Sequence, residues 1–128
     1  MTTTEINTHR KLTQAELVAE ARAAFGDDPA LWAFRCPTCG DVANGWDFEK
    51  ALTEHHRERN GNPVEAYSIV GQECIGRTLG ALTVKTDEEW KGRGCTWVAY
   101  GLFRGPWEIT LPDGRSIWGF PLATTPTA

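Results

Sequence analysis

The chain has four cysteines, and the first two stand in the pentapeptide Cys36-Pro37-Thr38-Cys39-Gly40. Two residues between the thiols let both sulfurs reach one metal ion from a single tight turn. A glycine after the second thiol lets the backbone curl, so that its N–H groups point at the sulfurs. The pentapeptide therefore predicts a metal knuckle, and the fold must bring further ligands to it.

Cys74 and Cys95 are the expected remaining ligands. A glycine lies within two residues of each, at Gly76 and Gly94, and there the backbone can approach an ion closely. We expect the four thiolates to hold one structural zinc ion, because tetrahedral thiolate sites take zinc or iron and zinc needs no redox partner. The alternative is that Cys74 and Cys95 are small buried hydrophobic residues, as free cysteine often is.

A second ligand set stays open, in which a histidine replaces one of the later cysteines. Phe48, Leu52 and His55 have the spacing of a zinc-finger helix that follows a cysteine pair, but Arg59 stands where the second histidine would be. Either His55 or His56 is then the candidate ligand. The simpler interpretation of both histidines is a solvated helix end.

Length and composition indicate one globular domain. The chain has 128 residues, of which 41% are hydrophobic, and this is enough for a modest core. No apolar run approaches the roughly 20 residues that cross a bilayer, so we expect no membrane association. The polar residues 1–10 do not have the pattern of a secretory signal, and we expect a cytoplasmic location. Thiols stay reduced there, which favours metal binding over disulfides.

The order of the patterns predicts an α+β fold, with N-terminal helices, the zinc knuckle and a C-terminal antiparallel β-sheet. We expect a flexible arm over residues 1–11, the zinc-stabilised domain over 12–122 and a polar tail over 123–128. The sequence Thr13-Gln14-Ala15-Glu16 has the form of a capping box and predicts a helix over residues 14–25, ended by Gly26.

Further elements follow from apolar spacing and turn residues. Residues 107–111 alternate in character, 112–115 have turn composition and 116–120 return, which predicts a hairpin. The other expected elements are a strand over 31–35, helices over 47–59 and 64–70, a polar loop over 83–94 and a buried strand over 96–103.

Two catalytic interpretations fit less well. The Cys36-x-x-Cys39 pair has the form of a glutaredoxin active site, but Gly40 opposes the helix that would lower the thiol pKa. His56-x-Glu58 matches part of the zinc-deaminase motif, yet in those enzymes it precedes the cysteine pair, and here it follows. Four thiolates also leave no coordination position for an activated water. We therefore expect no enzymatic activity, with a thiol oxidoreductase as the weaker alternative.

Three short blocks surround the four cysteines. They are the pentapeptide at 36–40, QECIGR at 72–77 followed by Gly80-Ala81, and GCTW at 94–97 followed by YGLF at 100–103. Together they resemble an uncharacterised family of short proteins from bacteria, prophages and tailed phages, especially phages of actinobacteria. The resemblance covers residues 33–122 and implies that all four cysteines belong to the motif. It implies no activity, substrate or fold.

Two binding functions remain open. The first is that of a small phage-type protein that docks onto a host or phage protein through exposed aromatic anchors at Trp46, Trp90 and Trp107. The second is nucleic-acid binding near the knuckle, with Lys91 and Arg93 beside Trp90. The net charge of −4 disfavours nucleic acid, because phosphate binding needs an excess of lysine and arginine.

Overall fold

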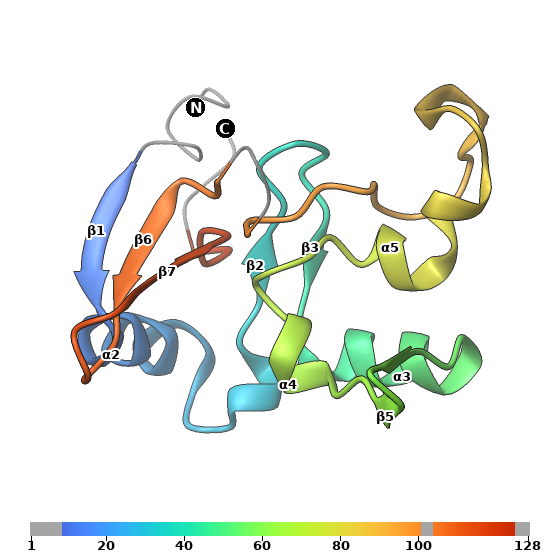
Figure 1. Cartoon of the computed structure of the whole chain (residues 1–128). Coiled ribbons are helices and arrows are strands. Elements are labelled where there is room, and N and C mark those ends of the chain that lie inside the picture. The colour runs from blue at the N-terminus through green and yellow to red at the C-terminus, as the bar shows by residue number, and fades with distance from the viewer. Residues whose placement is uncertain (1–8, 101–103, 125–128) are drawn as a thin grey trace.

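The fold is α+β, and two groups of elements lie on either side of a short hairpin. The structure, a computed structural model, describes residues 9–100 and 104–124. A three-stranded sheet with α2 (Gln14–Phe25) forms one group, and α3 (Gly45–Glu54), α4 (Ala66–Ile69) and α5 (Gly76–Leu79) form the other (Figure 1). The hairpin between them carries the first cysteine pair. This arrangement places the knuckle between the two groups.

The sheet has the strand order β1-β6-β7. The predicted hairpin is confirmed as β6 (Trp107–Thr110) and β7 (Ser116–Gly119), which pair antiparallel. The third strand, β1 (Arg10–Thr13), pairs parallel to β6, with Leu12 opposite Ile109. The expectation of a flexible arm is wrong for Arg10 and Lys11, which belong to β1. Only Leu12 of this strand is buried, so the strand is too short to give a visible alternation of apolar and polar residues in the sequence. Residues 1–8 lie outside the described part.

The helix α2 begins and ends where the sequence predicts. The amide of Glu16 donates to Thr13 Oγ1 at 3.1 Å, and the amide of Thr13 donates to Glu16 Oε1 at 2.8 Å, which completes the capping box. Gly26, with φ of 89°, ends the helix. Its apolar face packs Ala21 and Leu17 against the sheet.

The predicted strand over 31–35 is only half correct. Asp28 caps the amide of Ala30 at 3.0 Å, and with proline in the first position this starts a 3-10 turn, η1 (Pro29–Leu31). The strand is limited to β2 (Phe34–Arg35), which pairs with β3 (Val42–Ala43). Together they form the hairpin whose turn contains the knuckle.

The helix predicted over 47–59 is shifted and shorter. A second capping box, formed by Asn44 and Asp47, starts α3 at Gly45, two residues early. The helix ends at Glu54 because the chain then enters a hairpin, β4 (Glu58–Arg59) and β5 (Asn62–Pro63).

The turn of that hairpin explains two wrong predictions. Asn60 and Gly61 have φ of 54° and 80°, both in the left-handed region, as a tight two-residue hairpin turn requires. The Asn60-Gly61 pair was expected to end a helix, but it forms the turn that connects β4 to β5. Since residues 62–63 continue as β5, the helix predicted over 64–70 is reduced to the four residues of α4.

The segment after α5 is mostly irregular. The 3-10 turn η2 (Ala81–Thr83) ends where the predicted polar loop over 83–94 begins, and a second one, η3 (Asp87–Glu89), lies inside that loop. The buried strand predicted over 96–103 is wrong for the described residues 96–100, where only Val98 forms an isolated bridge, with Glu73. Residues 101–103 of this prediction lie outside the described part.

The buried residues form three clusters, and one of them contains Cys36 and Cys74, with Cys95 packed against it. Cys36 and Cys74 pack with Ala99 and Phe120, while Phe34 contacts both this cluster and the one under the sheet. Among residues 9–100 and 104–124, no helix has the length and apolar character needed to span a membrane.

Candidate metal centre

The β2–β3 turn holds the first cysteine pair as the pentapeptide predicts. The amide of Cys36 donates to Asp41 O at 2.9 Å and the amide of Gly40 donates to Cys36 O at 2.9 Å, which closes the loop. Gly40 has φ of 81°, a conformation that favours glycine. Cys36 is 2% exposed, whereas Cys39 is exposed at the tip.

The later cysteines are brought in by two segments that cross at close range. The amide of Cys74 donates to Trp97 O at 3.0 Å, so the segment before α5 lies along residues 95–98. A Cβ at Gly76 would lie 2.5 Å from the amide nitrogen of Cys95, and one at Gly94 would lie 3.0 Å from Cys74 Sγ. A side chain at either position would clash with the opposite segment. Gly76 and Gly94 therefore let the two segments lie close enough to bring Cys74 and Cys95 together.

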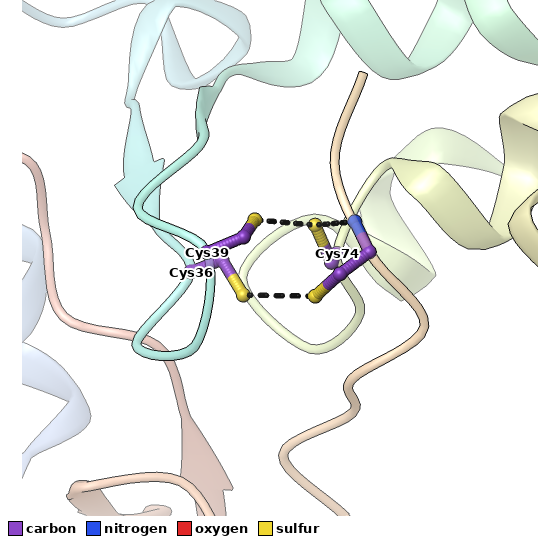
Figure 2. Close-up of side chains that lie close together, drawn as sticks. Cys36, Cys39 and Cys74 are labelled. Carbon is purple, nitrogen blue, oxygen red and sulfur yellow. Dashed lines mark hydrogen bonds between the residues drawn. The ribbon is translucent and has the colours of Figure 1, made fainter. Parts of the chain in front are cut away.

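The four sulfurs form one compact group. All the Sγ atoms lie within 4.8 Å of one another. Cys36 Sγ is 3.7 Å from Cys95 Sγ, and Cys39 Sγ is 3.6 Å from Cys74 Sγ; Figure 2 shows both contacts, with Cys36 and Cys39 facing Cys74 across the site. A tetrahedral ion with metal–sulfur bonds of about 2.3 Å places its ligands about 3.8 Å apart. A disulfide needs about 2.05 Å, so the spacing fits a shared cation and not paired disulfides.

Two backbone amides point at the sulfurs of the later cysteines. The amide of Cys95 donates to Cys74 Sγ at 3.1 Å and the amide of Trp97 reaches Cys95 Sγ at 3.5 Å, as in the outer shells of thiolate metal sites. The neighbouring thiol of Cys36, together with burial, raises the pKa of Cys74 to about 12. A free thiol there stays protonated at neutral pH, and a cation must displace its proton to bind.

The rival ligands do not join this group. His55 and His56 are both exposed, and His56 Nε2 lies 2.9 Å from a carboxylate oxygen of Glu58. In the described part of the chain, the four cysteines are the one cluster of three or more potential metal ligands. The cysteine pair is also followed by a turn and β3, not by the helix that a glutaredoxin-like thiol needs.

The predicted aromatic anchors do not form one exposed patch. Trp107 is 3% exposed in the core under Arg10, so its prediction as a surface anchor is wrong. Hairpin residues alternate between the two faces of a sheet, and Trp107 points to the buried one. Trp90 is half-buried, and its indole N–H donates to Gly94 O at 3.1 Å. Trp46 is 54% exposed, and Lys91 is exposed.

Arg93 has a role in the fold near the knuckle. Its Nε lies 2.8 Å from Asp41 Oδ1, and its Nη2 donates to Val42 O at 2.7 Å, while Asp47 is 3.7 Å away. These contacts tie the loop before Cys95 to the hairpin of the first cysteine pair. The guanidinium therefore has a structural role here, while the Arg93 side chain stays 41% exposed.

Sequence reasoning missed a buried carboxylate beside the centre. The side chain of Glu73 is fully buried; Arg57 Nη1 donates to it at 2.8 Å, and the phenol of Tyr100 also donates. Burial raises the pKa of Glu73, but the hydrogen bonds from Arg57 and Tyr100 and the charge of Arg57 outweigh it, so the net pKa lies below the ordinary value. Its position directly before Cys74 is the one sequence signal that points to it.

Comparison with known proteins adds a family and nothing beyond it. The sequence model of the VVA0879-like family matches residues 13–123, which is most of the chain. No curated protein and no solved structure matches.

Proposed function

We propose that this chain, which belongs to the VVA0879-like family, is a zinc-stabilised module that works by binding a protein and not by catalysis. The observation that carries the proposal is the group of four sulfurs within 4.8 Å, drawn from the β2–β3 turn, the segment before α5 and residues 94–97. Four thiolates complete a tetrahedral coordination sphere, which is the arrangement of structural zinc sites.

The role of the bound ion would be to hold the β2–β3 hairpin against the segment before α5 and residues 94–97. Cys36 and Cys39 lie on the hairpin between the two groups of elements, and Cys74 lies two residues before the start of α5. The 3-10 turns η2 and η3 are each only three residues long, and Val98 forms an isolated bridge in place of a strand. A structural zinc contributes folding free energy directly, and that supports a fold of short elements.

The metal part is tested on the untagged full chain, purified without a metal column, by elemental analysis and native mass spectrometry. We expect one zinc per chain. One iron per chain would correct the choice of metal, and the bare polypeptide mass with the fold intact would refute the site.

The binding part is tested separately. The resemblance to short phage and prophage proteins is the reason to seek the partner among host and phage proteins, in the cytoplasm, where thiols stay reduced. Chemical crosslinking in cells followed by mass spectrometry should recover a stoichiometric protein partner that persists as salt is raised. Recovery of nucleic acid alone, or of nothing above a mock sample, would refute this part.

A further inference from the structure

The described surface has an apolar hollow of ligand-binding size, and none of the four cysteines lines it. A cleft of about 450 Å³ lies between α2 and α4, with η1 and α3 as its other walls, and we call it the α2–α4 cleft. Its volume is within the roughly 300–1,000 Å³ typical of ligand sites. The apolar side chains that line it are Leu17, Val18, Ala30, Trp32, Phe34 and Val70.

A second hollow continues the first. It measures about 350 Å³ and shares Leu17, Phe34 and Val70 with the α2–α4 cleft, so the two hollows are neighbours. Tyr67 borders both hollows and is 82% exposed, although it is a large aromatic residue. An exposed tyrosine between two apolar hollows is the kind of residue that anchors a protein interface.

The charge around the cleft specifies the occupant. Glu49 and Glu65 line it, both are exposed, and neither carboxylate has a lysine, arginine or histidine nitrogen within 4 Å among the described residues. No basic residue of the described chain lines either hollow. The walls are therefore apolar and the only fixed charges are negative, which complements a cationic group.

We propose that the α2–α4 cleft binds a partner protein segment that presents a large apolar side chain together with a nearby lysine or arginine. The apolar side chain enters between Leu17 and Val70, beside Tyr67, and the cation lies against Glu49 and Glu65. Two neighbouring hollows with shared walls suit a length of polypeptide. This inference rests on the binding role proposed above and gives that role a place and a partner chemistry.

The test is selection of random 12-residue peptides, displayed on phage, on the immobilised metal-loaded full chain. We expect the selected peptides to combine an aromatic or large aliphatic residue with lysine or arginine. Labelled synthetic copies should then bind in fluorescence anisotropy, and weaken when salt rises from 50 to 500 mM because exposed charges are screened.

Variants locate the binding. Tyr67→Ala should weaken a selected peptide at least about tenfold, and the double change Glu49→Lys with Glu65→Lys should weaken it by a similar factor. These side chains are exposed, so the fold should tolerate the changes. Leu82→Ala, at an exposed position of η2, and Glu54→Lys, at an exposed position of α3, line neither hollow; they are the matched controls and should leave affinity within about twofold.

Four results would overturn the inference: no enrichment, enrichment of acidic peptides, binding that survives Tyr67→Ala, or a dimer of the chain that Tyr67→Ala dissociates. In the last case a second copy covers the cleft. If the crosslinked partner is recovered equally by wild type and Tyr67→Ala, the proposed function stands and only the cleft fails. If metal analysis or crosslinking fails while peptides bind as expected, the cleft stands on its own.

Discussion

Replacement of Cys39 by serine tests whether this cysteine is a metal ligand or an inert thiol. Cys39 is exposed, whereas Cys36 and Cys74 are each 2% exposed. If the thiols are inert, Cys39→Ser changes one exposed atom and should alter the free energy of unfolding by no more than about 0.5 kcal/mol. If Cys39 is one of four zinc ligands, its loss affects the whole site.

The expected magnitude follows from the metal. Apparent binding free energies of structural zinc are about 10–16 kcal/mol, so an equal share for one of four ligands is about 3 kcal/mol or more. Whole domains have stabilities of only about 5–15 kcal/mol. We therefore expect Cys39→Ser to lose a large part of the stability of the fold, comparable with Cys74→Ser or Cys95→Ser and in spite of its exposure.

The assay is urea unfolding monitored by tryptophan fluorescence, with excess zinc and again with a chelator. Wild type should lose stability when the metal is removed, whereas Cys39→Ser should be weak in both conditions. Thr38→Ser, an exposed neighbour on the same turn, is the control and should match wild type. A Cys39→Ser variant with wild-type stability in zinc, or a wild type indifferent to the chelator, would refute the metal interpretation.

Three further outcomes are expected. Gly76→Ala should lower metal affinity and stability, since its Cβ would meet the backbone of Cys95; a metal titration and a melting curve that match wild type would contradict the crossing described here. Glu73→Gln should cost about 3 kcal/mol in urea unfolding because it leaves Arg57 without its buried partner, whereas the exposed Glu58→Gln should cost little; equal costs would contradict the assigned role. Bound metal should be released as pH falls below neutral. The apparent affinity should drop about tenfold per pH unit for each proton that returns to a thiolate. A zinc indicator that shows retention of the metal at pH 4 would contradict thiolate ligation.

The lowered pKa of Glu73 also determines how its contribution to the stability of the fold changes with pH. The folded state binds this proton less readily than the unfolded state, so the stabilisation is present above the unfolded pKa of about 4.3 and is lost as pH falls through the lower folded value. Acid therefore weakens the fold through this carboxylate as well as through the thiolates.

Local chemistry explains which elements could be predicted. The Thr13–Glu16 capping box, the closing hairpin and the knuckle at 36–40 each depend on residues a few positions apart, and the structure has all three. Where two local signals compete, the prediction fails, as at Asn60-Gly61, which ends a helix in one interpretation and reverses a strand in the other. The choice between them depends on the strands that flank the turn.

The sequence by itself predicted the first cysteine pair and the class of the fold, because the spacing of that pair and the helix caps are properties of short segments. Tertiary structure alone decided that β1 joins β6, that Trp107 is buried and that Glu73 meets Arg57. It also created the α2–α4 cleft, since no single segment contains its walls. These features join residues far apart in the chain, and their contacts form only when packing selects one arrangement from many that local preferences allow.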